Sequence, residues 1–391
     1  MFGKRSKEKQ AAAQRWVETW PAFERWAQEP TALADCLDFR QLLSQPAFAD
    51  FFEQVMASEA AGRAALDKLS GELAAMDVYK GCLSAHLCGA LIEQWGANAV
   101  VGRQLVEAFC RVLALCCAFL ARAQQALGCQ EEDFDAEALQ EAELAALFAR
   151  QADETRAFLG CDLITLALMA VITRQSEARM YLREQGVYEQ VQVVQRFKEN
   201  MTFVDEVYRA CSQLEVTVLA PKVMRGFRAV LHDVNNCFHL FTLLEAELCR
   251  QGWLEDYAVA GYRWDKALYE VATGQRYPKS QASIGAHQQY YTVWAVRPDG
   301  GYQVTRKTEA GVQMDPNALI WGEMSPEAIP LWQGQRIIII DSEGMFAGRS
   351  WDGSFITKCH DALSPSLRLT ETLQEEACRT LWEAIKHKEQ A

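Results

Sequence analysis

The sequence lacks most of the motifs that identify a common enzyme. It contains no P-loop, no dinucleotide-binding glycine fingerprint and no Gly-x-Ser-x-Gly nucleophile motif. It is also short of positive charge, with 39 basic residues against 52 acidic ones and a formal net charge of −13. Nucleic acids and anionic membranes are bound through clustered lysine and arginine. We therefore expect neither a nucleic acid nor a membrane as the main partner.

Metal-binding cysteine patterns and long apolar runs are missing as well. The 13 cysteines include no Cys-x-x-Cys pair and are scattered, as at Cys110, Cys116 and Cys117. We interpret them as free structural thiols in a reducing compartment, and we expect no metal and no cofactor. The apolar runs 112–120 and 159–172 are shorter than the roughly 20 residues that cross a bilayer. They predict buried core helices in a cytoplasmic protein.

What the sequence does contain is mostly helical pattern. Residues 8–156 are rich in Ala, Glu, Gln, Leu and Arg and have no strand-like alternation. At 391 residues the chain is long enough for two or three domains. We predict a mainly α fold: a helical bundle over 1–156, a helical stretch over 157–275, and a small α+β domain with an antiparallel sheet over 286–391.

The stretch 161–214 contains three short amphipathic segments. One of them reads SEARMYLREQGV, with Ser176 as a helix cap and Gly186 as the stop. This stretch resembles one unit of the armadillo family, in which such a segment leads into a longer helix that lines a groove. The resemblance implies stacked helices that present a concave face to a protein or peptide.

One long helix is expected at 222–250. Apolar residues recur there at alternating steps of three and four, which predicts a continuous apolar seam that begins at Val223, Phe227, Val230 and Val234. The opposite side would carry a polar stripe of arginine, histidine and asparagine. We predict that the rest of the fold packs on the apolar seam of this helix.

The polar stripe includes the candidate catalytic residues His232, Asp233 and Asn236. With Asn235, they resemble the phosphoacceptor segment of sensor histidine kinases and sporulation-type phosphotransferases. The resemblance implies that the imidazole of His232 accepts a phosphoryl group while a carboxylate orients the ring. No downstream ATP-binding glycine motifs accompany it.

The last third alternates like a sheet and is rich in tryptophan. The segment GQRIIIIDSEG predicts a strand, RPDGG predicts a hairpin turn, and Thr372 with Glu375 predicts the capped start of a last helix. The pair Asp341 and Glu343 resembles the first metal-binding strand of ribonuclease-H-like exonucleases, which is a second enzymatic alternative. Aromatic residues are frequent at recognition surfaces, so the ligand-binding candidates, together with His239, are Trp294, Trp321, Trp332 and Trp351.

Taken together, the sequence favours a non-catalytic scaffold or protein-interaction module over both enzymatic alternatives. The expected partner is another protein or peptide, and the excess of acidic residues favours one that is basic or neutral.

Overall fold

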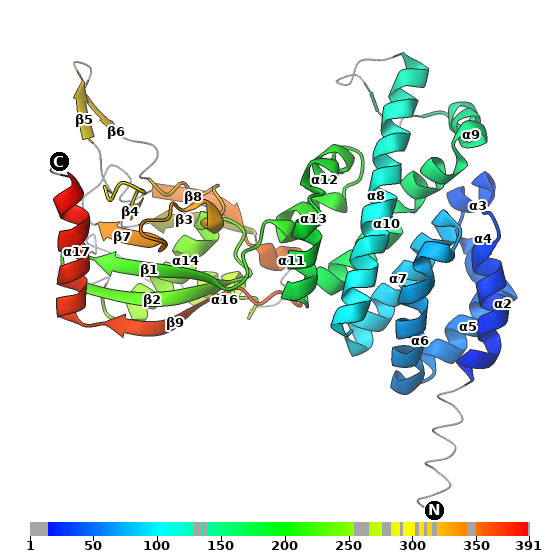
Figure 1. The fold of residues 1–391 in the computed structure, drawn as a ribbon, viewed down its shortest axis with the longest axis horizontal. Helices are drawn as coiled ribbons and strands as arrows, with labels where there is room; N and C mark the ends of the chain where they lie inside the picture. Colours follow the sequence, from blue (N-terminus) through cyan, green and yellow to red (C-terminus); the bar gives the residue numbers. More distant parts are fainter. Residues whose placement is uncertain are drawn as a thin grey trace, which may run out of the picture. The chain divides into compact units, whose positions relative to one another are not determined.

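The computed structural model describes residues 15–128, 134–135, 139–253, 266–275, 283–289, 292–301, 305–308, 311–314, 319–341 and 349–389. The chain divides into two compact units, Met1–Tyr208 and Arg209–Ala391, here called unit 1 and unit 2. Unit 1 is helical, and unit 2 is built on a sheet (Figure 1). The predicted fold class, mainly α with a small α+β part at the C-terminal end, is confirmed. The dividing point differs from the predicted ones, because the sheet already begins with residues after 209.

Unit 1 opens with a group of short helices that share an aromatic core. Phe23 stacks on Phe51 with ring centroids 4.1 Å apart, and Trp20, Trp26 and Phe48 surround this pair. The helices are α2 (Trp16–Gln28), α3 (Leu33–Leu37), α4 (Arg40–Ser44), α5 (Pro46–Met56) and α6 (Glu59–Glu72), followed by the 3₁₀ turn η1 (Leu73–Ala75).

Three long helices form the core of unit 1: α7 (Val78–Trp95), α8 (Ala99–Leu127) and α10 (Ala152–Ile172). Small residues let α7 and α10 approach closely, since a Cβ on Gly89 would lie 2.8 Å from the Cα of Ala167. Asn98 starts α8 by accepting hydrogen bonds from two main-chain amides, and Gly128 ends it in a left-handed conformation.

By length and composition, α8 and α10 are long and apolar enough to cross a membrane. Of their most apolar windows, 50% and 78% respectively are buried inside the protein. The two runs predicted as core helices lie within α8 and α10.

A buried ion network joins the N-terminal helices to this core. Lys80 is 4% exposed, and its Nζ donates to the main-chain oxygens of Trp26 and Glu29 at 2.6 and 2.9 Å, next to the end of α2. Arg156 reaches the carboxylate of Asp77 at 3.3 Å. Burial lowers the pKa of Lys80, and the two carbonyls accept two of the three hydrogen bonds that its ammonium group can donate. The network is therefore a structural connection rather than an open site.

The remaining helices in the described part of unit 1 are α9 (Glu141–Arg150), α11 (Ser176–Glu184), α12 (Tyr188–Gln195) and α13 (Met201–Tyr208). Three of them follow the predicted short segments. Ser176 is the first residue of α11 rather than its cap, while Gly186 ends that segment with φ = 65°, as expected. The armadillo resemblance stays a prediction.

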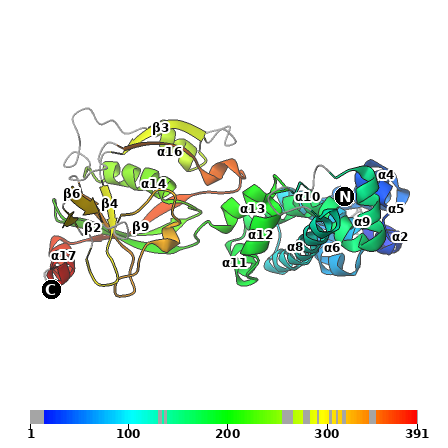
Figure 2. The same ribbon diagram turned by 90° about the horizontal axis from the view of Figure 1, so that it is seen from above.

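Unit 2 is organised on a five-stranded sheet in the order β4-β7-β1-β2-β9. Neighbouring strands are antiparallel except for β1 and β7, which run parallel. Figures 1 and 2 show this sheet with α14 and α16 on one side of it. The strands are β1 (Leu214–Ala220), β2 (Arg225–His232), β4 (Thr292–Ala295), β7 (Ile337–Asp341) and β9 (Ser366–Leu373).

The predicted single helix over 222–250 is wrong. Its first part is the turn after β1 and then strand β2, and only the second part is helical, as α14 (Cys237–Arg250). Phe227 and Val234 are fully buried, but they belong to the strand and to the connection that follows it. The apolar residues in this segment fit the spacing of a helix as well as that of a strand. The segment forms a strand because it pairs with β1 and β9.

The two faces of the sheet are packed differently. On one face, alternate residues such as Val216, Val218 and Phe227 form a large apolar core with α14 and α16 (Lys266–Ala272). The other face is covered at one end by α17 (Glu375–Glu389). There Gly226 allows close approach, since a Cβ would lie 2.9 Å from the carbonyl oxygen of Val218 and 3.1 Å from the Sγ of Cys378.

Shorter elements complete unit 2. Two further two-stranded sheets pair β3 with β8 and β5 with β6. Thr372, predicted as a helix cap, lies in β9. The bounds are β3 (Ser283–Gln289), β5 (Thr305–Thr308), β6 (Gly311–Met314), η4 (Pro326–Ala328), β8 (Arg349–Ser354) and η5 (Ile356–Lys358).

Candidate functional site

The predicted catalytic residues lie where β2 passes into α14. His232 is the last residue of β2. Asp233 follows with φ = 54°, and its carboxylate accepts from the amide of Ser364 at 3.2 Å. Asn236 is the N-cap of α14, accepting from the amide of His239 at 2.9 Å. The helix on which the phosphotransfer resemblance depended is absent at His232, and phosphoryl acceptance by this residue stays a prediction.

His239, a candidate ligand-binding residue, is completely buried. Its Nε2 lies 2.9 Å from the carbonyl oxygen of Ala272 in α16, so this nitrogen must carry a proton and donate. The ring lies 4.8 Å from that of Phe355. Burial lowers the pKa of His239 to about 4, although the hydrogen bond to Ala272 opposes this shift. His239 is thus a neutral core residue.

The candidate tryptophans whose burial the structure describes differ in their surroundings. Trp294 and Trp332 are 2% and 3% exposed and belong to the apolar cluster beneath α17. Trp321 is 39% exposed. Trp351 lies in β8. Two of the four predicted ligand-binding tryptophans are therefore core residues.

The nuclease alternative rested on Asp341 and Glu343. Asp341 is the last residue of β7, and Glu343 lies outside the described residues. Within the described part of the chain, no group of three or more histidine, cysteine, aspartate or glutamate side chains is placed to hold a metal ion.

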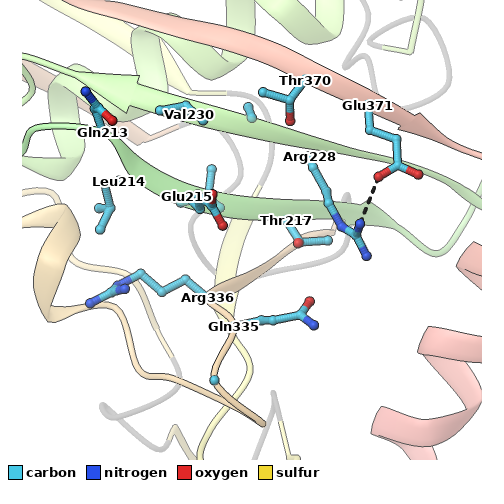
Figure 3. Close-up of a pocket in the computed structure, with 13 residues that line it drawn as sticks. Gln213, Leu214, Glu215, Thr217, Arg228, Val230, Gln335, Arg336, Thr370 and Glu371 are labelled. Carbon is cyan, nitrogen blue, oxygen red and sulfur yellow. Dashed lines mark hydrogen bonds and ion pairs between the residues drawn. The ribbon is translucent and has the colours of Figure 1, made fainter.

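A hollow in unit 2 lies over a part of the sheet that α17 leaves uncovered. It is a cavity of about 640 Å³ that crosses the first half of β1 and reaches β2, β9 and the turn before β7 (Figure 3). We call it the sheet cavity. Its lining residues are Gln213, Leu214, Glu215, Val216, Thr217, Arg228, Ala229, Val230, Gly334, Gln335, Arg336, Thr370 and Glu371.

The cavity exists because β7 pairs only with the second half of β1. The parallel ladder begins at Thr217, whose amide donates to the carbonyl oxygen of Arg336 at 2.8 Å. Just before this point the chain makes a tight two-residue turn, in which Trp332 and Gln335 exchange main-chain hydrogen bonds. Gln333 and Gly334 occupy the turn with φ of 49° and 78°, as a hairpin turn of this kind requires. The turn leads the chain away from β1 and leaves the first half of that strand open.

Charged side chains of both signs surround the hollow (Figure 3). Arg228 on β2 and Glu371 on β9 form an ion pair at 2.8 Å, with both side chains about half exposed. Glu215 on β1 is exposed. Arg336 donates from Nη2 to the carbonyl oxygen of Glu327 at 2.9 Å, and its buried Nε has no partner within the described residues. The lining therefore offers two guanidinium groups and two carboxylates, an arrangement suited to a polar ligand of little net charge.

Sequence reasoning missed this site because β1 and β2 were interpreted as helix. A signal was present in LEVTVLA, in which Val216 and Val218 alternate with Glu215 and Thr217. This period of two is typical of a strand with one buried and one polar face. No residue type in the lining, taken alone, identifies a binding site.

Unit 1 has a second hollow of different character. A groove of about 460 Å³ lies between α5 and α7, and its lining is apolar apart from His86. Phe52 at its edge is 41% exposed. Nothing in its lining selects a particular occupant.

No protein-family model, curated protein or solved structure matches this chain.

Proposed function

We propose that this chain is a non-catalytic, cytoplasmic protein-interaction module, and that the sheet cavity of unit 2 binds a peptide segment of its partner. The observation that carries the proposal is the cavity itself. It is an open hollow of about 640 Å³ against a rigid strand, lined by exposed groups of both charges. Small-molecule and peptide sites in proteins are concave and combine a firm scaffold with a few well-placed polar groups.

The charge balance of the cavity supports a peptide over a highly charged ligand. Arg228 and Glu371 form an ion pair, and the lining carries one further carboxylate, Glu215, and one further guanidinium group, Arg336. A nucleotide or a polyanion would require an excess of positive groups. The overall charge of −13 likewise favours the approach of a neutral or basic partner.

The thiols support the cytoplasmic location. Every cysteine in the described residues is free, and most are buried in apolar surroundings. Burial raises the pKa of Cys110 to about 11 and that of Cys36 to about 12, so these thiols are protonated and unreactive at neutral pH. Such thiols persist in a reducing compartment.

The proposal is tested by selecting random linear peptides on phage against the full chain. The enriched peptides are then titrated calorimetrically into the wild type and into two variants, Arg228→Ala and Glu371→Ala. We expect each variant to bind about tenfold more weakly or worse, since each removes a polar group that lines the cavity.

A matched pair on α17 serves as the control. Arg379 and Glu375 form an ion pair at 2.7 Å with similar exposure, but they do not line the cavity. Arg379→Ala and Glu375→Ala should bind like the wild type. If no peptide is enriched, or if the cavity variants and the control variants bind equally well, the proposed function is wrong.

A further inference from the structure

One strand residue in the sheet cavity has main-chain groups that the sheet does not use. Thr217 donates its amide to Arg336, on the side of β1 that faces β7. Main-chain groups of a strand point alternately to its two sides, so those of Glu215, two residues earlier, point the same way. Within the described residues, no main-chain hydrogen bond involves the amide or the carbonyl oxygen of Glu215.

The opposite side of β1 is paired with β2 over the same residues. Leu214 and Val216 pair with Leu231 and Ala229 of β2 in a regular antiparallel register. The strand is therefore held straight from one side while its other side is open. A strand with an unused row of amides and carbonyls is a template for another extended chain.

The open side of Glu215 is also where the sheet cavity lies. The lining of the cavity includes five consecutive residues, 213–217. Consecutive strand residues point to opposite faces, so a hollow that contacts all five reaches the edge of the strand and not only one face. An incoming chain would find space directly beside the unpaired groups.

Arg336 lies in the same lining, and its guanidinium group has hydrogen-bond donors left for a ligand. The side chain is partly exposed, and within the described residues its guanidinium group makes one hydrogen bond, from Nη2 to the carbonyl oxygen of Glu327. A guanidinium group binds a carboxylate through two parallel hydrogen bonds, which adds both strength and orientation. The natural ligand group for this position is a carboxylate.

We propose that the partner peptide binds as an added strand, pairing its main chain with the amide and carbonyl of Glu215 and placing a carboxylate on Arg336. This inference rests on the proposed function and specifies how that function is carried out. The bound segment is short, about three or four residues at roughly 3.3 Å each, because β7 occupies the edge of β1 from Thr217 onward. The carboxylate comes either from an Asp or Glu side chain or from the C-terminus of the partner.

The strand pairing is tested with peptides methylated at one main-chain nitrogen at a time. The probe is the tightest-binding peptide from the phage selection, titrated into the full chain. Methylation removes a donor without changing any side chain. We expect one position to lose about tenfold or more in affinity, while methylation at the adjacent positions, whose amides point away from β1, has little effect.

The source of the carboxylate is tested on the same probe peptide. One arm replaces the free C-terminus by an amide, and the other replaces each Asp or Glu by Asn or Gln. We expect a loss of about tenfold or more in one arm. Arg336→Gln should remove the difference between the charged and the neutral peptide, while Arg379→Ala should preserve it.

The outcomes separate this inference from the function on which it rests. If the cavity variants weaken binding but no single methylation does, the peptide binds in the cavity without pairing to β1, and the added strand is wrong. If neutralising every carboxylate leaves the affinity unchanged, the role of Arg336 is wrong. If no peptide depends on Arg228 or Glu371, the proposed function itself fails.

Discussion

The amide of Thr217 donates to the carbonyl oxygen of Arg336 at 2.8 Å, and this hydrogen bond marks the place where β7 joins β1. Beyond it β1 is paired on both sides, and before it only on one. From Thr217 onward β1 is thus covered by β7, and before Thr217 it lines the cavity. The binding site that we propose is a consequence of how the sheet is assembled.

The cap of α14 gives a first prediction. The side chain of Asn236 accepts a hydrogen bond from the amide of His239, so Asn236→Ala should reduce the free energy of unfolding by about 1 kcal/mol. Asn236→Ser keeps a capping oxygen and should retain most of the stability. Chemical denaturation of the three proteins measures the difference. Equal losses in both variants would contradict a capping role.

The buried His239 gives a pH dependence. Its pKa falls from 6.5 to about 4 on folding, so the folded protein favours the neutral ring. The stability that the neutral His239 gives the folded protein is therefore fully present above pH 6.5. As the pH falls from 6.5 towards 4, the free energy of unfolding decreases by up to about 3 kcal/mol because of this group. Below pH 4 no further loss arises from this group.

The measurement for this prediction is the unfolding free energy between pH 7 and pH 4 for the wild type and for His239→Gln. The variant does not titrate at this position, and its stability should fall less steeply over the same range, whatever its stability at pH 7. Parallel curves would contradict the assignment of a buried neutral imidazole.

The packing of unit 1 gives a prediction with a built-in control. A Cβ on Gly89 would lie 2.8 Å from the main chain of α10, so Gly89→Ala should push the helices apart and cost about 1 to 3 kcal/mol. Gly71 in α6 is exposed, and a Cβ there would meet only the end of the Gln104 side chain at 3.4 Å.

Gly71→Ala should therefore leave stability unchanged or raise it by up to about 1 kcal/mol, because alanine favours the helix. Thermal unfolding followed by circular dichroism compares the two variants. A neutral Gly89→Ala would show that α7 and α10 are not packed as closely as described.

Much of unit 1 could be predicted from the sequence because its helices carry local signals. Asn98 and Gly128 bound α8, and helical periodicity fills the space between them. The strand β7 was also predictable, since four consecutive isoleucines between turn residues are typical of a buried strand.

The single helix predicted over 222–250 was wrong because one apolar pattern extends across three different elements. Apolar residues at steps of three and four fit a helix from 222 to 250, yet they are spread over a turn, the strand β2 and the helix α14. Asn236 is a helix-start signal in the middle of that range, and it marks where α14 begins. The pairing of β2 with β1 is a local hairpin that turns at residues 221–224, whereas the pairing of β2 with β9 is long-range, so no local window contains it.

The sheet cavity could not be predicted for the same reason. It depends on the meeting of one hairpin, residues 213–217 and 228–230, with residues 334–336 and 370–371, which lie far from that hairpin in the chain. Only the alternation around Glu215 and Thr217 was visible beforehand, and it indicates a strand but not an open edge.

The most direct test of this account is site-resolved amide hydrogen exchange in the free full-length chain, repeated with the selected peptide. We expect the amide of Glu215 to exchange rapidly in the free protein, while those of Val216 and Thr217, which are paired within the sheet, exchange slowly. Binding of the peptide should then protect Glu215. An amide of Glu215 that is already as slow as that of Thr217 without peptide would contradict the account, because the edge of β1 would not be open.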